Sequence, residues 1–349
     1  MLGDDHMKEM KTVDAVGKIL CHDITQIIKG VTKDARFRKG HVITPEDVPV
    51  LLSLGKDHIF IWENDETMLH EDEAAAVLRD LCIGEHMEAS APKEGKIELR
   101  ATCDGVFQVD EARFDAVNAL DEVTIATLPQ NFPVKKGQKL AGMRVIPLVI
   151  KKDKMAEVQR VAGQGPLLRL RPYRTDLKVG VVTTGTEVYL GRIKDTFTPV
   201  IEGKLKRFGL TINEHRLSDD VKEHTEANIR ELLELGMDLI LCTGGMSVDP
   251  DDRTPAAIRD AGAEIVTYGA PVLPGAMFLL GYFQRDGRTV PVMGLPGCVM
   301  YAQATVFDMA LPRILTGERL TRQEIRHWGI GGLCQGCPTC HYPVCGFQH

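Results

Sequence analysis

Short apolar runs alternate with longer amphipathic segments along the second half of the chain. The apolar runs predict strands over residues 178–184, 211–217, 238–243, 264–267 and 289–293. The segments between them predict helices near residues 199–208, 222–235, 255–261 and 299–310. Strands that alternate with helices of this length are typical of βαβ units, in which helices cover both faces of a parallel sheet. We therefore predict a three-layer α/β domain with a parallel sheet over residues 176–315.

The first half of the chain mixes short helical and strand-like patterns. Helices are expected over residues 44–54 and 65–82, because each begins with capping or acidic residues and ends before a glycine. Strands are expected over residues 59–62, 97–101, 106–109, 122–127 and 143–150, with Asp104-Gly105 as a hairpin turn. We interpret residues 1–165 as a mixed α+β, partly β-rich accessory region of one or two modules, followed by a linker near residues 163–174.

Size and charge narrow the classes of function. A chain of 349 residues favours two or three domains. The formal net charge of −7 gives no overall positive field, so we expect neither nucleic acid nor an anionic membrane as a partner. No apolar run approaches the roughly 20 residues of a membrane-spanning helix, and the N-terminal residues lack the hydrophobic core of a signal peptide. We expect a cytoplasmic protein.

Glycines and hydroxyl side chains follow three of the predicted strands. They are Thr184, Gly185 and Thr186 after the first strand, Gly244, Gly245 and Ser247 after the third, and Gly294, Pro296 and Gly297 after the last. Glycine lets backbone N–H groups approach a ligand, and a helix N-terminus favours phosphate or carboxylate. Because ligands of α/β sheets bind at the carboxyl ends of the strands, we predict an anion site there. The chain has no G-x-x-x-x-G-K-[ST] motif, which excludes a P-loop NTPase.

Carboxylates fall in loops at the same predicted edge of the sheet. They are Glu187, Asp219, Asp249, Asp251 and Asp252. Each would repel a phosphate by about 1 kcal/mol at close range even in water, and bound Mg²⁺ would remove that conflict. Some acidic residues in these loops have a structural role as an alternative to ligand binding. Asp220 is expected to cap the next helix together with Glu223, and Asp249 and Asp251 could form a solvated turn before Thr254-Pro255, the expected N-cap and first-turn proline.

As a set, these motifs resemble the molybdopterin-binding domain family of molybdenum cofactor biosynthesis. The matching segments cover residues 176–315 in the family's order: VVTTGTE at 181–187, LSDDV at 217–221, TGGMS at 243–247, PVLPGA at 271–276 and GLPG at 294–297. Family members include a molybdopterin adenylyltransferase, which activates the pterin with ATP, and a molybdotransferase, which inserts molybdate. The resemblance implies molybdopterin or its adenylylated form, together with molybdate, as ligands. It allows a homo-oligomer and a molybdoenzyme partner.

The resemblance also implies roles for residues. Asp219 and Asp252 match acidic residues associated with Mg²⁺ and catalysis, and Glu187 matches a carboxylate of the molybdotransferase branch. The positions that match pterin- or phosphate-contacting loops are Gly244, Gly245, Ser247, Pro274, Gly275, Gly294 and Gly297. The acidic layout after Ser247 and the large N-terminal region favour the molybdotransferase branch. The expected activity is therefore Mg²⁺-dependent molybdate insertion by a transferase.

The chain departs from the family's pattern at three places. Nothing matches the asparagine-serine-alanine-methionine-aspartate-glycine segment of the molybdotransferase, Cys298 replaces an asparagine, and Leu273 replaces a lysine. Two alternatives therefore stay open. One is a carrier or sensor that binds the cofactor without turnover, and the other is a nucleotide pyrophosphatase of the competence-damage type.

Residues 330–349 form a cysteine-rich tail that contains Cys334, Cys337, Cys340 and Cys345. Four thiols so close together in a hydrophilic segment predict a metal site. The C-x2-C-x2-C run resembles the run that wraps a [4Fe–4S] cluster, although the last spacing is longer and no proline follows. Zn²⁺, bound by four sulfurs or by three sulfurs and His341, is the alternative to the favoured Fe–S cluster.

Overall fold

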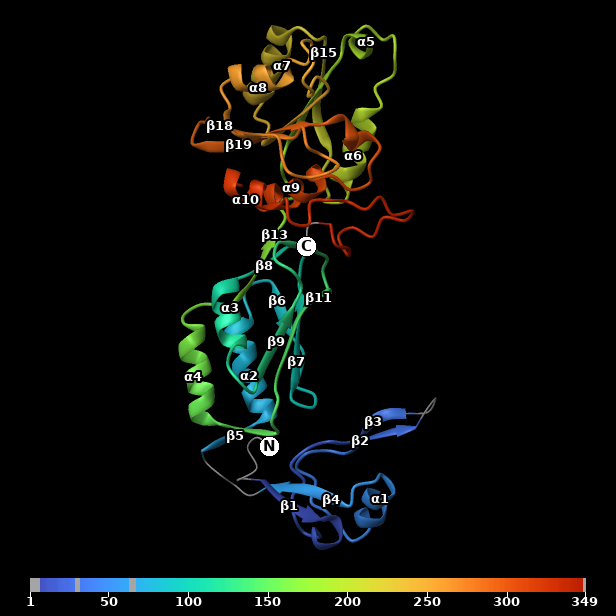
Figure 1. Cartoon of the computed structure of the whole chain (residues 1–349), viewed down its shortest axis with the longest axis vertical. Helices are drawn as coiled ribbons and strands as arrows, with labels where there is room; N and C mark the ends of the chain where they lie inside the picture. Colours follow the sequence, from blue (N-terminus) through green and yellow to red (C-terminus); the bar gives the residue numbers. More distant parts are fainter. Residues whose placement is uncertain (1–6, 29–31, 63–66, 348–349) are drawn as a thin grey trace. The chain divides into compact units, whose positions relative to one another are not determined.

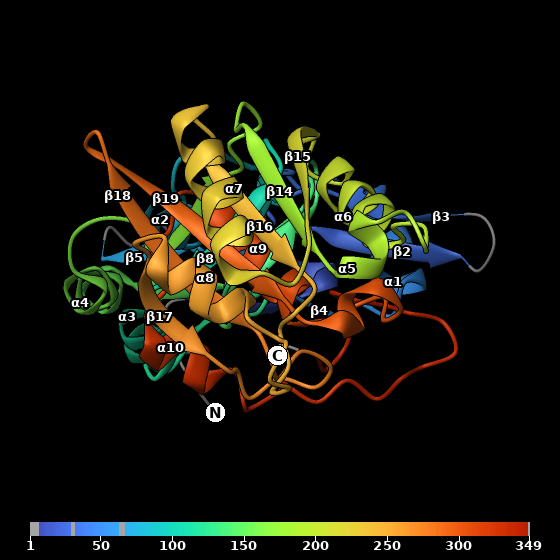
Figure 2. The ribbon, with the colours of Figure 1, turned by 90° about the horizontal axis from the view of Figure 1, so that it is seen from above.

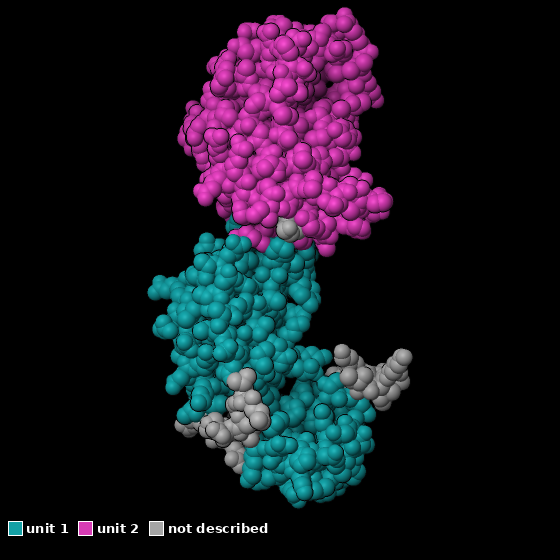
Figure 3. Space-filling model, viewed as in Figure 1, with its two compact units in different colours: residues 1–103, 107–129, 134–170 teal, residues 104–106, 130–133, 171–349 magenta. Residues whose placement is uncertain are grey.

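The computed structural model describes residues 7–28, 32–62 and 67–347, which divide into two units (Figure 3). Unit 1 contains residues 1–103, 107–129 and 134–170. Unit 2 contains residues 104–106, 130–133 and 171–349. A three-stranded sheet of order β10-β8-β13 is formed by β10 (Phe132–Val134), β8 (Gly105–Val109) and β13 (Leu168–Pro172).

The N-terminal part of unit 1 has a small hydrophobic core of its own and contains two pairs of antiparallel strands. Its elements are β1 (Met7–Lys11), η1 (Thr12–Asp14), β2 (Ile24–Ile28), β3 (Thr32–Phe37), α1 (Asp47–Ser53) and β4 (His58–Trp62). Strand β1 pairs with β4, and β2 pairs with β3. The helix expected from residue 44 begins at Asp47, with Glu46 at its N-cap. Thr44 lies before the helix and donates its backbone N–H and its hydroxyl to Asp47 Oδ2, at 2.8 and 2.9 Å.

The rest of unit 1 is built on a four-stranded antiparallel sheet of order β6-β7-β11-β9 (Figure 1). Its strands are β6 (Met87–Ala89), β7 (Lys96–Ala101), β9 (Val123–Thr127) and β11 (Lys139–Val145), and a separate pair joins β5 (Met68–His70) to β12 (Val149–Lys151). The helices are α2 (Glu71–Cys82), α3 (Glu111–Asn118) and α4 (Lys152–Ala162). In β7, Ile97, Leu99 and Ala101 are buried on one face, as the alternation predicts.

Four predictions for unit 1 need correction. The prediction that Asp104-Gly105 joins β7 and β8 in a hairpin is wrong, because β7 pairs with β6 and β11 whereas β8 pairs with β10 and β13. The strand expected over residues 143–150 is two strands, interrupted around Pro147. The helix expected from residue 65 begins at Glu71, after strand β5, and residues 65–66 lie outside the described residues. Helices α3 and α4 were not expected, although Asp110 accepts a hydrogen bond from Arg113 N–H as an N-cap.

Unit 2 contains a six-stranded sheet of order β15-β14-β16-β19-β18-β17. The strands are β14 (Val179–Thr184), β15 (Ile212–Ser218), β16 (Leu239–Thr243), β17 (Glu264–Tyr268), β18 (Leu279–Arg285) and β19 (Arg288–Leu295). Strands β15, β14, β16 and β19 are parallel, and β17 and β18 add an antiparallel edge. In Figure 2, β18 and β19 lie at one side of this sheet and β14 and β15 at the other.

Helices cover both faces of the sheet in unit 2, which confirms the three-layer α/β prediction. They are α5 (Thr186–Tyr189), α6 (Phe197–Lys206), α7 (Lys222–Glu234), α8 (Thr254–Asp260), η2 (Gly297–Met300), α9 (Val306–Leu315) and α10 (Arg322–His327). Alternate residues of the central strands point to opposite cores. Val182 and Ile240 pack with α7 and α8, whereas Val181 and Leu241 pack with α6 and α9. In Figure 1 the sheet lies between α7 and α8 above and α9 and α10 below.

Several elements of unit 2 differ from the prediction, and the short helices α5 and α10 were not expected. Strand β18 was not expected, and it makes the sheet mixed; Asp286 and Gly287, both with positive φ, form the two-residue turn between β18 and β19. The helix expected over residues 299–310 is instead the short η2 followed by α9. Helix α9 begins later because Thr305 and Asp308 form a capping box. Among the described residues, no helix is long and apolar enough to cross a membrane.

Candidate functional site

The carboxyl ends of β14 and β16 are adjacent at the point where the strand order changes direction. From β14 the chain proceeds to β15 on one side, whereas β16 borders β19 on the other side. In open α/β sheets, ligands bind outside the strand ends at such a point. Thr184 ends β14, and Gly244 directly follows β16. Two of the predicted ligand loops therefore meet here.

The two loops touch through their backbones. Thr184 Oγ1 donates to the Thr243 carbonyl at 3.1 Å and lies 3.2 Å from Thr254 Oγ1. A Cβ atom on Gly244 would lie 2.3 Å from the Thr184 carbonyl oxygen, and one on Gly245 would lie 2.7 Å from Thr254 Oγ1. Both glycines have positive φ, of 82° and 55°. Glycine is therefore required at both positions by conformation and by space.

Hydrogen bonds connect the start of α5 to the loop after β15. Thr186 N–H donates to Asp220 Oδ2 at 3.0 Å, and Asp220 N–H donates to Thr186 Oγ1 at 3.3 Å. Gly185 N–H donates to the Ser218 carbonyl at 3.0 Å. The prediction that Asp220 caps the following helix is wrong, because α7 has Val221 at its N-cap without a side-chain cap. The Asp220 carboxylate is used instead to fix the loop after β14.

The carboxylates of Asp219 and Glu187 have different surroundings. Asp219 Oδ1 accepts from Val221 N–H at 3.2 Å and lies 2.9 Å from His224 Nδ1, with 21% of its side chain exposed. Glu187 lies on the short helix α5 and is exposed. Asp219 is therefore held in place by its own loop and by α7, and Glu187 faces solvent.

The loop between β16 and α8 carries Ser247 and Asp252. Ser247 is exposed, and Asp252, which is partly buried, donates its N–H to the Asp249 carbonyl at 2.9 Å. Tyr268 holds this loop, since its hydroxyl donates to the carbonyls of Met246 and Ser247 at 3.0 and 3.1 Å. Burial and the nearby Asp252 raise the pKa of Tyr268. No motif in the sequence identifies Tyr268.

Thr254 was expected to be the N-cap of α8, which is wrong. Thr254 is the first residue of the helix, Arg253 is at the N-cap, and Pro255 follows in the first turn. The Thr254 hydroxyl contacts Thr184, which adds it to the residues that join the two loops.

The remaining predicted glycines are arranged differently. Gly294 lies inside β19, and its Cβ would be 2.5 Å from Met246 Cε, so it makes room for a buried methionine. Pro296 and Gly297 follow the end of β19, whose Leu295 pairs with Thr243. Pro274 and Gly275 contact α9: the Pro274 carbonyl accepts from Val306 N–H at 3.2 Å, and a Cβ on Gly275 would be 2.5 Å from Val306 Cγ1.

A polar group on the α6 side of the sheet was also not expected from the sequence. His215 Nε2 lies 3.0 Å from Thr183 Oγ1 and 3.2 Å from Thr198 Oγ1. Burial lowers the pKa of His215. Beside Thr183, the fully buried Thr243 Oγ1 has no hydrogen-bond partner within the described part of the chain. A buried hydroxyl without a partner costs free energy unless a ligand or water completes it.

Metal ligation was predicted at two places, by Glu187, Asp219 and Asp252 and by the tail cysteines. Within residues 7–28, 32–62 and 67–347, no three His, Cys, Asp or Glu side chains are close enough together to hold a metal ion. Cys334 and Cys345 are partly buried against the core of unit 2, whereas Cys337 and Cys340 are exposed. Both metal sites therefore remain predictions.

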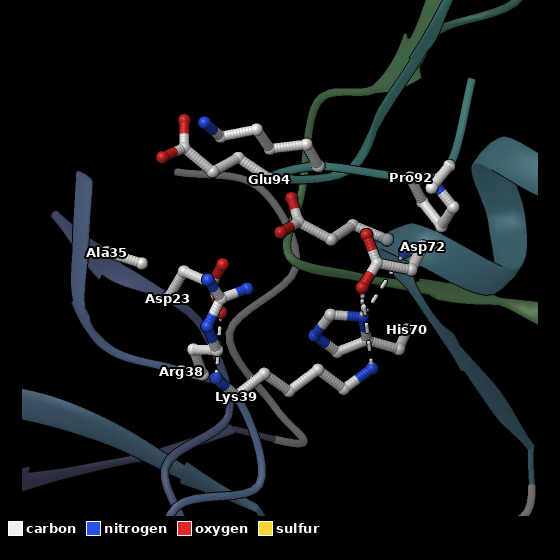
Figure 4. Close-up of a pocket in the computed structure, with 11 residues that line it drawn as sticks. Asp23, Ala35, Arg38, Lys39, His70, Asp72, Pro92 and Glu94 are labelled. Atoms are coloured by element: carbon white, nitrogen blue, oxygen red, sulfur yellow. Dashed lines mark hydrogen bonds and ion pairs between the residues drawn. The ribbon is translucent and has the colours of Figure 1, made fainter. Parts of the chain in front are cut away.

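Unit 1 contains a separate charged cavity of about 370 Å³ (Figure 4). Figure 4 shows Lys39 extended along His70 toward Asp72, and Lys39 Nζ lies 3.9 Å from Asp72 Oδ2. Glu71, also at the cavity, has 10% of its side chain exposed and lies 3.7 Å from Arg144 Nη2. Burial, with a contribution from Asp72, raises the pKa of Glu71 to about 7. No sequence motif marked this cavity.

Each of the two units contains a segment that matches a known protein family. Residues 180–316 match a family described as "Probable molybdopterin binding domain", and residues 9–63 match a domain of unknown function. Curated relatives include the CinA-like proteins of Mycobacterium avium (strain 104) and Mycobacterium tuberculosis (strain H37Rv). Each is 36% identical over 90 residues, which is 26% of this chain and 21% of the relative. The match therefore spans about a fifth of those proteins.

Solved structures with a similar arrangement include two described as MoaB. The molybdopterin biosynthesis enzyme MoaB of Thermus thermophilus is 22% identical, with a TM-score of 0.33, and the match covers 41% of this chain and 98% of that one. The tungsten cofactor synthesizing protein MoaB of Pyrococcus furiosus is 19% identical, with a TM-score of 0.34 and the same coverage. The family match over residues 180–316 thus supports a molybdopterin-binding domain in this part of the chain.

Proposed function

We propose that unit 2 binds the phosphate end of a molybdopterin at the ends of β14 and β16 and catalyses Mg²⁺-dependent molybdate insertion. The contact between Thr184 and the Gly244-Gly245 pair carries this proposal. It joins two glycine-rich loops at the change in strand order, where backbone N–H groups and hydroxyls can face a phosphate.

The hydroxyl groups at this edge would act in two ways. Thr184 Oγ1 already donates to the Thr243 carbonyl, so Thr184 positions the loops. Thr186 Oγ1 accepts from Asp220 N–H, which leaves its proton to donate to a phosphate oxygen. Ser247 is exposed on the loop held by Tyr268 and can donate in the same way. Thr186 and Ser247 are thus the proposed phosphate donors.

The chemistry of the acidic residues fits Mg²⁺. This ion is usually held by one or two carboxylates together with substrate phosphates and water, so carboxylates that do not form a complete cage still suit it. Because no three such side chains are close enough together to form a cage in the described part of the chain, Asp219, Asp252 and Glu187 would each contact an ion that arrives with the substrate phosphate. His224 would orient the Asp219 carboxylate. When bound, Mg²⁺ would neutralise phosphate charge and polarise the bond to the leaving group.

The test is release of AMP from adenylylated molybdopterin in the presence of molybdate and Mg²⁺. We expect wild-type protein to release AMP and Asp252→Asn to be slower by about 100-fold, a typical loss when one electrostatic contact to a reacting group is removed. Asp249→Asn, in the same loop, is the matched control and should retain activity. Folded wild-type protein that releases no AMP would contradict the proposal.

Two alternative functions are each supported by a separate observation. The CinA-like relatives favour a nucleotide pyrophosphatase, which would hydrolyse the diphosphate bond of ADP-ribose or of a similar nucleotide. Leu273 and Cys298, at positions where the resembled family has lysine and asparagine, favour a carrier that binds the cofactor without turnover. The same protein assayed with ADP-ribose, and titrated with molybdopterin, separates these functions. Hydrolysis of ADP-ribose supports the first, and tight binding without AMP release supports the second.

A further inference from the structure

The cysteine-rich tail is hydrogen-bonded to the loop that contains Pro274 and Gly275. Leu273 N–H donates to the Gly332 carbonyl at 2.7 Å, and Cys334 N–H donates to the Leu273 carbonyl at 2.9 Å. Leu273 and Leu333 form a parallel bridge. The tail therefore pairs with this loop as a short strand would.

The far end of the tail is anchored on the core of unit 2. Tyr342 donates its hydroxyl to the Asp308 carbonyl at 3.0 Å, and the ring of Phe347 is packed edge-on against Tyr342. Phe347 is 3% exposed and belongs to the core that contains α9. Both ends of the cysteine-rich segment are thus fixed on the same unit.

Between these anchors, the chain has no packing that would explain its cysteines. Residues 335–341 are all exposed or partly exposed and contain no helix or strand. Cys337 and Cys340 lie in this stretch, although cysteine is among the residues most often buried. Cys334 and Cys345 flank the stretch, half-buried against the core. The exposed sulfur atoms therefore call for a chemical role, since they have no packing role.

We propose that Cys334, Cys337, Cys340 and Cys345 bind one metal centre, which fixes the loop 271–275 through its hydrogen bonds to the tail. In the described structure these thiols are not yet gathered into a site. Residues 335–341, which include Cys337 and Cys340, are exposed, so these residues would give up little burial if they moved toward the other two cysteines. Each thiol loses its proton to solvent as it ligates the metal. Four thiolates complete either a zinc tetrahedron or the ligand set of a [4Fe–4S] cluster.

The inference depends on the proposed function only for the role of loop 271–275 as a ligand loop. Metal binding would restrain the segment that pairs with Leu273, so the backbone around Leu273 should open less often. Opening of hydrogen-bonded backbone is measured by amide hydrogen exchange. We expect at least tenfold slower exchange of the Leu273 and Cys334 amides, which join the loop to the tail, when the centre is formed.

The test uses the full chain after removal of metal under reducing conditions. One sample receives Zn²⁺, and another receives ferric iron, a thiol reductant and sulfide without oxygen, so that ferric and ferrous iron are both present for a [4Fe–4S] cluster. Bound metal per chain, visible absorption and amide exchange are measured. We expect one centre per chain in one of the two samples, with slower exchange of the Leu273 and Cys334 amides. The double variant Cys337→Ser/Cys340→Ser changes only exposed side chains and should bind no metal, whereas the control Cys103→Ser should bind as wild type does.

The outcomes separate the parts of the inference. No metal in either sample, or binding unchanged in the double variant, would overturn the site. Metal binding without slower exchange of the Leu273 and Cys334 amides would overturn the connection to the loop. Neither sample contains pterin, so failure here leaves the AMP assay unaffected, and failure of that assay leaves this result unaffected.

Discussion

At the scale of single residues, the Gly244 position is tightly constrained within the candidate site. Its φ of +82° already disfavours any L side chain, and an added Cβ would also collide with the Thr184 carbonyl. Gly236, after α7, has a similar φ of +77° but has only Arg288 Nη2, at 4.0 Å, near the added atom. The two glycines therefore separate the cost of conformation from the cost of contact.

We predict that Gly236→Ala lowers the free energy of unfolding by about 1 kcal/mol, the cost of a left-handed conformation. Gly244→Ala should lower it further and weaken molybdopterin binding at least tenfold, because the loops after β14 and β16 must separate. Urea unfolding and a binding titration check both variants. Equal effects of the two substitutions would show that the contact with Thr184 does not matter.

Glu71 gives unit 1 a pH-dependent stability. Its pKa is about 7 in the folded protein and near the ordinary 4.5 when unfolded, so between these values the folded state holds the extra proton. The free energy of unfolding therefore falls as the pH rises from 4.5 to 7, by up to about 3 kcal/mol. We expect Glu71→Gln to be more stable than wild type at pH 8 and to differ little at pH 4. The exposed Glu85→Gln is the control; a wild-type stability that is flat over this pH range would refute the prediction.

At the scale of elements, patterns within a segment were predictive and pairings between distant segments were not. The strands β14 and β16 are buried along their whole length, and short apolar runs predicted both of them. The loop after β16 needs glycine because it lies against the backbone at the end of β14, and the sequence does not reveal that contact. The carboxylate of Asp220 could have capped α7, its nearest helix; instead it binds Thr186, 34 positions earlier. Residue spacing alone does not reveal whether a carboxylate accepts a hydrogen bond from the nearest helix or from a distant loop.

Tyr268 shows the same limit, because its partners lie more than 20 positions away on the loop after β16. We predict that Tyr268→Phe lowers the free energy of unfolding by only about 1 kcal/mol, the usual net value of one hydrogen bond. It should speed amide exchange at residues 246–252 and weaken ligand binding, because the loop loses its link to β17. Tyr301→Phe, a change at a highly exposed tyrosine, is the control. Unchanged exchange in Tyr268→Phe would contradict the holding role.

At the scale of the whole molecule, each unit has its own hydrophobic core, so each should unfold in its own transition. A buried ion pair in unit 2 provides a test. Lys204 Nζ lies 2.7 Å from both Asp308 oxygens, and both side chains are less than 10% exposed. Asp308 also accepts the Thr305 N–H that caps α9.

We predict that Asp308→Asn destabilises unit 2 by about 3–5 kcal/mol, because Lys204 is left buried without its counter-charge. Calorimetry should show one transition moved to lower temperature and the other unchanged. At pH 8, Glu71→Gln should move only the transition of unit 1, to higher temperature. A single transition that moves as a whole in both variants would contradict independent unfolding.

The division of the chain between the two units has a consequence for cutting and rearranging it. The chain passes between the units at residues 103/104, 106/107, 129/130, 133/134 and 170/171. A shortened gene that begins at codon 171 would therefore encode unit 2 without its residues 104–106 and 130–133. After one proteolytic cut at that point, the fragment 1–170 would still contain residues 104–106 and 130–133, which belong to unit 2.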